Sequence, residues 1–228
     1  MSPSPTIKNS PQARLLLYRL IASKLSDTEK RLLAANPGLW QRLLTELEAE
    51  LDLFNNSDKA ILTRAFSYID KSSQEGLQRQ VKLLTGSSLW LGIKATSLLE
   101  DFIKEHLTLI KSVQREHLEK IGLSLQRGIR HGLLQKDIAK EIRAHTSLGK
   151  HRANLIARSA PLQYSGVLTK YHQESAGIKR YRWQTSQDER VRKSHAKLDG
   201  QIFDWSDHGP HPRSEVNCRC DAVPVLDV

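Results

Sequence analysis

Residues 102–132 read FIKEHLTLIKSVQREHLEKIGLSLQRGIRHG. Apolar side chains recur in this stretch mostly at steps of three and four residues, which is the spacing of an amphipathic helix. The residues that carry the pattern are Ile103, Leu107, Ile110, Leu118, Ile121, Leu125 and Ile129. The spacing predicts one long helix, or two in line, from about Ser88 to Arg130, with Gly132 as its terminator.

Helical patterns also lie on both sides of this segment. A capping box at Ser26 and Glu29 predicts a helix start, and Pro37 lies close to the predicted end of that helix. Glycine, asparagine and serine clusters at 55–57 and 86–88 predict further breaks. The helices expected from these signals cover about 26–36, 39–54, two segments between 57 and 86, then 137–143 and 149–174, with a stop at Gly177.

The pattern changes after Gly177. Tyr181 and Trp183 alternate with polar residues, as in a short strand. A second capping box, Ser186 with Glu189, predicts a helix to about Leu198, and residues 222–226 could form a closing strand. The expected fold class is therefore mainly α, with a long-helix N-terminal region and a small C-terminal α+β module. The expected divisions are a disordered arm at 1–9, a helical region at 10–95, long helices at 96–178 and the module at 179–228.

Composition limits the possible classes of protein. The 228 residues are 39% hydrophobic and 26% charged, which is ordinary for a soluble chain. No run of eighteen apolar residues predicts a membrane span, and the N-terminus lacks a signal pattern, so we expect synthesis in a cytoplasm without export. A disulfide between Cys218 and Cys220 would be strained, so free or metal-bound thiols are expected.

Basic residues are concentrated in one part of the chain. Residues 127–193 hold fifteen Lys or Arg against five Asp or Glu, which accounts for the net charge of +10. Such a field attracts polyanions, although a solvated basic face without a partner remains an alternative. Because no aromatic residues are interleaved around the start of the 149–174 helix, any nucleic-acid contact would be with the backbone and independent of sequence. The candidate DNA-contacting residues are Arg127, Arg130, Lys136, Lys140, Arg143, Lys150, Arg152 and Arg158.

The terminal module gathers most of the side chains that could carry chemistry, and three interpretations stay open. A structural zinc site could use His195, His211, Cys218 and Cys220, with His208 as a substitute. A catalytic centre could use His195 with Asp188 or Asp199, but no recognised catalytic motif is present. In the third interpretation, which we favour, His195 and the cysteines pack in the core of the module and Asp188 lies in a first helical turn.

Two blocks in this module carry a family resemblance. Residues 183–203, WQTSQDERVRKSHAKLDGQIF, together with Asn217-Cys218-Arg219-Cys220 and the following Ala222-Val-Pro-Val, resemble the signature of Mu F-like and SPP1 gp7-like minor head proteins of phages. Residues 152–158, 177–183 and the helix from 102 to 132 also fit, so the resemblance covers about 100–226. The residues after Arg158, Ser159-Ala160-Pro161, depart from the acidic or polar residue frequent there in the family.

The resemblance implies a non-enzymatic virion component that acts in head morphogenesis. Its expected partners are the portal protein and other head or scaffold proteins, through contacts that could include residues 10–95, and DNA through the basic stretch. Its expected location is the capsid interior or portal vertex, and the host cytoplasm during assembly. The alternatives from other classes are a metal-dependent nuclease or toxin-like effector centred on His195, and a free-standing DNA-binding protein.

Overall fold

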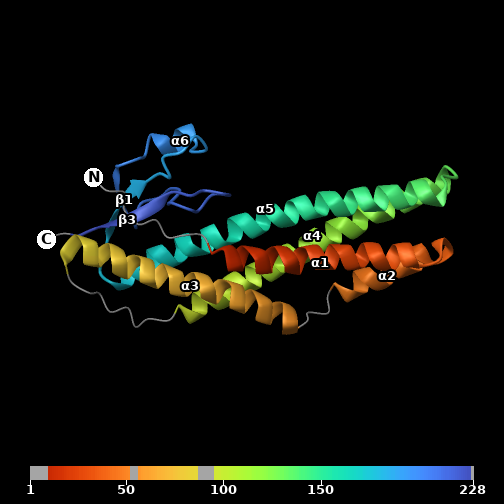
Figure 1. The fold of residues 1–228 in the computed structure, drawn as a ribbon, viewed down its shortest axis with the longest axis horizontal. Coiled ribbons are helices and arrows are strands. Elements are labelled where there is room, and N and C mark those ends of the chain that lie inside the picture. Colours follow the sequence, from red (N-terminus) through yellow and green to blue (C-terminus); the bar gives the residue numbers. More distant parts are fainter. Residues whose placement is uncertain (1–9, 52–55, 87–94, 227–228) are drawn as a thin grey trace. The chain divides into compact units, whose positions relative to one another are not determined.

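Helices dominate the computed structural model, which describes residues 10–51, 56–86 and 95–226 (Figure 1). The expected mainly α fold with a small α+β module is confirmed. In chain order the elements are α1 (Pro11–Ala34), the 3-10 helix η1 (Pro37–Leu39), α2 (Trp40–Glu50), α3 (Asn56–Thr85), α4 (Thr96–Arg130), α5 (Gln135–Ser175), β1 (Arg180–Gln184), α6 (Lys193–Ala196), β2 (Ile202–Asp204) and β3 (Asp221–Val225).

Contacts divide the chain into two compact units. Unit 1 consists of Met1–Arg14, Arg64–Glu100 and Arg158–Val228, and unit 2 consists of Leu15–Thr63 and Asp101–Ala157. Helices α1, α3, α4 and α5 each contribute to both units. The units therefore do not coincide with the ranges 10–95, 96–178 and 179–228 expected from the sequence, and the expected arm at 1–9 lies outside the described residues.

Unit 2 is built around apolar side chains from α1, α2, α4 and α5. The buried residues of this core are Leu32, Trp40, Leu44, Leu47, Leu118, Ile121, Leu125, Ile138 and Ile142. The Trp40 indole Nε1 donates a hydrogen bond of 2.7 Å to the carbonyl oxygen of Leu32, so the buried ring leaves no donor unpaired. The periodic apolar stripe of residues 102–132 thus contributes to this core, as its spacing predicts.

Close helix packing explains why α5 has no break in its first half. The sequence predicts separate helices at 137–143 and 149–174, and this prediction is wrong, since α5 is continuous. A Cβ at Gly149 would lie 2.9 Å from a Leu25 methyl carbon, and a Cβ at Gly128 on α4 would lie 2.6 Å from Ile138 side-chain carbons. Both glycines sit within helices where a neighbouring side chain approaches closely.

Other helix boundaries are partly as expected. The predicted start at Ser26 is wrong, because α1 runs through it from Pro11, and the two segments expected between 57 and 86 form the single helix α3. Gly86, Gly132 and Gly177 have φ values of 72°, 62° and 76°, and each follows the end of a helix as predicted. No helix within residues 10–51, 56–86 and 95–226 combines the length and the apolar character that a membrane crossing needs.

Unit 1 contains an antiparallel sheet with the strand order β2-β1-β3, of which β1 and β3 are labelled in Figure 1. The predicted strands at 180–184 and 222–226 are confirmed as β1 and β3, paired from Arg180 with Val225 to Gln184 with Asp221. Strand β2, paired with β1 through Tyr181 and Phe203, is not among the strands that the sequence predicts. Elsewhere in this unit, Phe66 on α3 meets Tyr164 on α5 edge to face.

The helix predicted from Ser186 to Leu198 is reduced to the single turn α6. The Asp188 carboxylate accepts a hydrogen bond from the backbone N–H of Arg190 at 3.1 Å and pairs with Arg219 at 2.5 and 2.6 Å. Gln187 takes a positive φ of 53°. Because these interactions hold residues 186–192 in a turn, the helix begins only at Lys193.

Candidate metal centre

The centre of the module is an aromatic core on one face of β1. Alternate residues of a strand point to opposite faces, and Tyr181 and Trp183 are both buried while their neighbours Arg180 and Arg182 are exposed. Trp205, Cys218, Cys220 and Ala222 complete this cluster. The two cysteines therefore belong to the core that β1 organises.

The short helix α6 places His195 against this core. The His195 ring meets the Trp183 ring edge to face with 5.3 Å between centroids, and only 4% of the histidine is exposed. One ring nitrogen, Nε2, lies 3.3 Å from a Glu215 carboxylate oxygen but lacks the geometry of a hydrogen bond. The carboxylate of Glu215 is itself held by Arg192 at 3.1 Å.

The chain that leads into β3 places both sulfur atoms next to that ring. The backbone N–H of Cys218 donates to the carbonyl of Glu215 at 3.1 Å, and the backbone N–H of Arg213 donates to the Cys218 sulfur at 3.3 Å. Arg213 and Asn217 adopt positive φ values of 70° and 56°, which fold this loop tightly. Cys220 directly precedes β3, so the sheet fixes its position.

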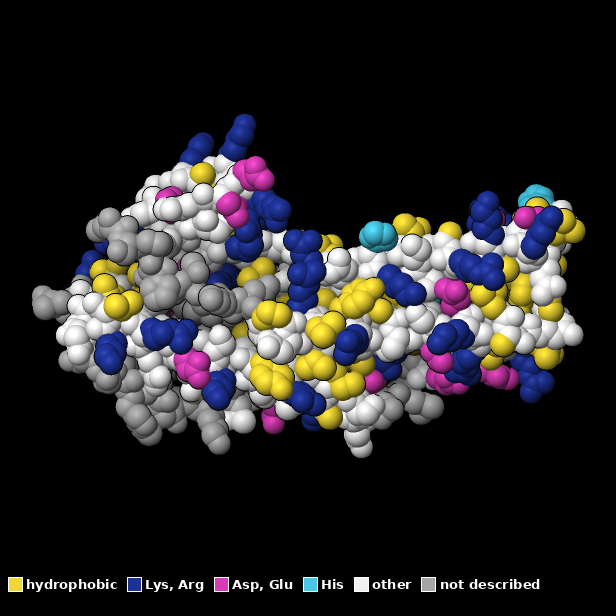
Figure 2. Space-filling model, in the orientation of Figure 1, with side chains coloured by type: hydrophobic (Ala, Val, Ile, Leu, Met, Phe, Trp, Pro, Cys, Tyr) yellow, Lys and Arg dark blue, Asp and Glu magenta, His cyan; other side chains and the backbone are white. Residues whose placement is uncertain are grey.

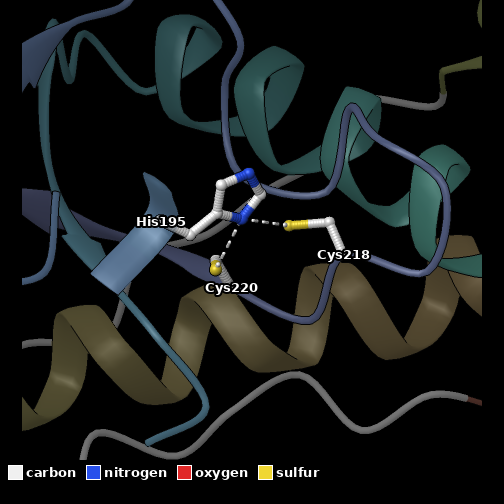
Figure 3. Close-up of side chains that lie close together, drawn as sticks. All are labelled: His195, Cys218 and Cys220. Carbon is white, nitrogen blue, oxygen red and sulfur yellow. Dashed lines mark hydrogen bonds between the residues drawn. The ribbon is translucent and has the colours of Figure 1, made fainter. Parts of the chain in front are cut away.

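Three buried ligand-type groups consequently converge. The Nδ1 atom of His195 lies 3.6 Å from the Cys218 sulfur and 3.5 Å from the Cys220 sulfur, and both sulfurs point toward it (Figure 3). All three ligand atoms lie within 4.8 Å of one another, and neither cysteine is in a disulfide. One imidazole and two thiols are a donor set that suits zinc and other metals with affinity for thiolates.

The two thiols share their protons unequally. A hydrogen bond from the Cys220 thiol lowers the pKa of Cys218 to about 5, against the opposing effect of burial. The same interaction, together with burial, raises the pKa of Cys220. Of the two thiols, Cys218 is therefore the one that gives up its proton more readily.

A buried ion pair stabilises the loop that carries the two cysteines. Arg213 and Asp221, exposed by 3% and 4%, form an ion pair, and Arg213 also donates to the hydroxyl oxygen of Ser165 on α5. The Nε atom of Arg213 donates to the carbonyl oxygen of Cys220 at 3.3 Å. This network ties the cysteine loop to both β3 and α5.

Residues 119–223 match the family described as Phage Mu protein F like protein, a range that includes the whole of this centre. This part of the chain is therefore similar to the Mu F-like family. The predicted resemblance, placed at about 100–226, is confirmed. Residues 119–223 are called the Mu F-like region below.

Two curated proteins are similar to the chain. An uncharacterized protein of Haemophilus influenzae is 39% identical over 125 residues, which is 54% of this chain and 28% of that protein. Minor head protein GP7 of Bacillus phage SPP1 is 23% identical over 169 residues, which is 64% of this chain and 55% of that protein. The chain thus spans only part of the length of each relative. No solved structure matches it.

Within the Mu F-like region, His211 does not join the predicted zinc ligands. Its Nδ1 atom lies 2.8 Å from the Tyr181 hydroxyl, and its ring packs against Trp205 with 5.1 Å between centroids. Burial raises the pKa of Tyr181, so the phenol stays protonated and can donate to that nitrogen. The predicted substitute ligand, His208, is exposed. Three of the four predicted ligands come together, and the fourth lies elsewhere.

The candidate DNA-contacting residues occupy different environments. Arg130, Lys136, Lys140 and Arg143 are exposed in unit 2, and Lys150 is half-buried. Arg127 pairs with Glu141 at 3.3 Å, and Arg152 pairs with Glu116.

Arg158, in unit 1, lines a cavity of about 310 Å³ that also reaches the metal-ligand cluster. Four more arginines line this cavity, namely Arg14, Arg190, Arg192 and Arg219, and so do His195, Cys218 and Cys220. Arg14 comes from the start of α1, far away in sequence, so no local pattern indicates this arrangement. The cluster therefore borders a basic cavity.

Proposed function

We propose that this protein is a minor head protein of a phage, a virion structural component that acts in head morphogenesis. The observation that carries the proposal is the Mu F-like region, residues 119–223. The similarity to Minor head protein GP7 of Bacillus phage SPP1, over 169 residues, supports the same role. The expected partners are other phage head components, and the expected location is the virion.

Mass spectrometry of purified virions and of empty procapsids tests this role. We expect the chain in virions at a copy number far below that of the major capsid protein. Its presence in procapsids would place it in assembly before DNA packaging. Absence from both particles, with the protein abundant in infected cells, would refute a structural role.

A finer part of the proposal is contact with DNA at the portal vertex or in the capsid interior. Lys136, Lys140 and Arg143 are exposed at i, i+4 and i+7 on α5, so they share one face of that helix. Figure 2 shows Lys and Arg side chains on the visible face, interspersed with hydrophobic groups and with some Asp and Glu. A distributed basic surface suits a sequence-independent contact with phosphates.

Reversing the three charges on α5 tests this contact. The triple variant Lys136→Glu, Lys140→Glu and Arg143→Glu should bind duplex DNA more weakly than the wild type. The slope of log affinity against log salt should shrink by about 0.9 for each phosphate that the variant no longer neutralises, or about 3 in all.

A charge-matched control reverses Arg19, Lys30 and Lys59, which are exposed in unit 2 on α1 and α3. It has the same net charge as the α5 variant. An equal decrease in affinity in both triple variants would mean that only net charge matters, and the proposed face of α5 would be rejected.

The alternative of a nuclease or effector centred on His195 has less support from the geometry. Asp188 is engaged by Arg219, and Asp199 accepts hydrogen bonds from the backbone N–H and hydroxyl of Thr185 at 2.7 and 2.9 Å. The interactions of both carboxylates thus stabilise the fold of the module. Cleavage of DNA or RNA that requires a metal and is abolished by His195→Ala would nevertheless overturn the structural role.

A further inference from the structure

We propose that His195, Cys218 and Cys220 bind one zinc ion through three protein ligands, with the fourth coordination position open to the arginine-lined cavity. The proposal goes beyond the role in the phage head and does not depend on it. It rests on the geometry of three buried side chains and on the residues that line the cavity beside them.

The distances in the cluster are those that a tetrahedral zinc ion imposes. Zinc lies about 2.3 Å from a thiolate sulfur and about 2.0–2.1 Å from an imidazole nitrogen, so tetrahedral angles separate the two ligand atoms by about 3.6 Å. The distances from His195 Nδ1 to the two sulfurs are 3.6 and 3.5 Å. The side chains are therefore already spaced for a shared ion.

Hydrogen bonding alone leaves the histidine poorly satisfied. His195 is 4% exposed, its Nδ1 has two sulfur atoms as its neighbours, and its Nε2 has no hydrogen-bond partner. Buried polar groups are normally paired, and sulfur is a weak partner. Coordination through Nδ1 would satisfy that nitrogen, and a small shift of Glu215, now 3.3 Å away, would pair Nε2. A carboxylate behind a ligand histidine is a common second contact in zinc sites.

The surrounding charges are compatible with two thiolates and a divalent ion. The backbone N–H of Arg213 already donates to the Cys218 sulfur, as expected for a thiolate ligand. The guanidinium of Arg213 is neutralised by Asp221, and that of Arg219 by Asp188. Two thiolates would then balance the charge of zinc.

The cavity determines which ligand can occupy the fourth coordination position. His195, Cys218 and Cys220 all line the same 310 Å³ cavity, together with Arg158, Arg190 and three further arginines. Zinc sites with three protein ligands keep an exchangeable fourth ligand, usually water. Because the cavity wall is rich in guanidinium groups, an anion with oxygen donors, such as phosphate, should compete for that position.

Metal content tests the ligand set. Protein purified without a metal-chelating tag and reconstituted with zinc should hold about one equivalent per chain after dialysis, and His195→Ala and Cys218→Ser should hold close to none. The matched control is His211→Ala, which removes a histidine of the same module that packs against Tyr181 and Trp205. This control should retain the full equivalent. Zinc-free wild-type protein after reconstitution, or loss of zinc in His211→Ala, would overturn the three-ligand assignment.

The zinc affinity of a Glu215 variant gives a second test, which does not require the His195 and Cys218 variants to fold. In competition with a chromogenic chelator, Glu215→Gln should weaken zinc binding by about 10-fold or more, because it removes the carboxylate behind His195. Circular dichroism should show that this variant is folded. Unchanged affinity would reject the role of Glu215 in positioning the ring.

Cobalt substitution tests the open position. Co²⁺ in the wild-type protein should show thiolate-to-metal charge-transfer absorption and intense tetrahedral d–d bands. Titration with inorganic phosphate should shift the d–d bands in the wild type, and Arg158→Ala with Arg190→Ala should raise the phosphate concentration needed. Bands that do not respond to phosphate would reject the proposed anion-accepting fourth position.

Discussion

His117 provides a specific prediction about acid stability. It lies on α4 within unit 2, is 4% exposed, and neither of its ring nitrogens makes a hydrogen bond of good geometry. Burial, with an added contribution from the nearby His145, lowers the pKa of His117 from 6.5 to about 4. The folded protein therefore holds this ring neutral at pH values where the unfolded chain protonates it.

The sign and size of the effect follow from that difference. Above pH 6.5 the ring is neutral in both states and does not affect stability. As the pH falls from 6.5 to about 4 the unfolded state binds the extra proton, so stability falls, and below about 4 the penalty stays constant. At about 1.4 kcal/mol per pKa unit, the full loss is about 3 kcal/mol, of which about 2.5 kcal/mol develops between pH 7 and pH 4.5.

Urea unfolding followed by circular dichroism at pH 7 and pH 4.5 measures this loss. His117→Leu should reduce the difference in unfolding free energy between the two pH values by about 2.5 kcal/mol. His131→Gln removes an exposed histidine beyond the end of α4 and should retain the wild-type difference. An identical pH dependence in wild type and His117→Leu, or an NMR titration of the His117 ring near pH 6.5, would refute the reasoning.

Two other substitutions should destabilise the module. Gln173→Leu on α5 should cost about 2–4 kcal/mol, because the Gln173 amide accepts from Trp205 Nε1 at 3.0 Å and donates to the Ala222 carbonyl at 2.8 Å, and both groups would be left unpaired. A thermal shift below about 2 °C would contradict it. Asp221→Asn should cost about 3–5 kcal/mol, since it leaves the Arg213 charge buried without its counter-ion. Stability equal to wild type in a urea titration would show that the pair is dispensable.

The helices show where the local sequence predicts the secondary structure correctly and where it does not. The apolar stripe of α4 and the glycines after α3, α4 and α5 are local signals. The structure follows them except at Ile129, which is 70% exposed. The capping box at Ser26 fails because α1 continues through it, with Leu25 and Leu32 buried on either side. The predicted helix start at 149 fails because α5 is continuous there, and the lack of a side chain at Gly149 makes room for Leu25. Tertiary packing therefore overrides the local signal at both positions.

The sequence identifies the types of residue that could bind a metal, but it does not identify every residue that lines the candidate site. His195, Cys218 and Cys220 stand out in the sequence as potential ligands because few other residue types bind zinc. His211 belongs to the same stretch of sequence, but the turn of the loop directs it to Tyr181. The cavity beside the cluster needs Arg14 and Arg158, which are far from the module in sequence. Only the tertiary fold brings them there.

The C-terminal half of α5 packs with the C-terminal module, which the sequence predicts at residues 179–228. Lys170 donates to the carbonyl of Trp205 at 2.8 Å, Gln173 bonds Trp205 and Ala222, and Ser165 accepts from Arg213. The sheet is small, with strands of five, three and five residues, so it has little core of its own. Its stability must come from the helix and the buried polar network, to which a zinc ion would add a further cross-link. Unit 1 resumes on α5 at Arg158, so these contacts all lie within one unit.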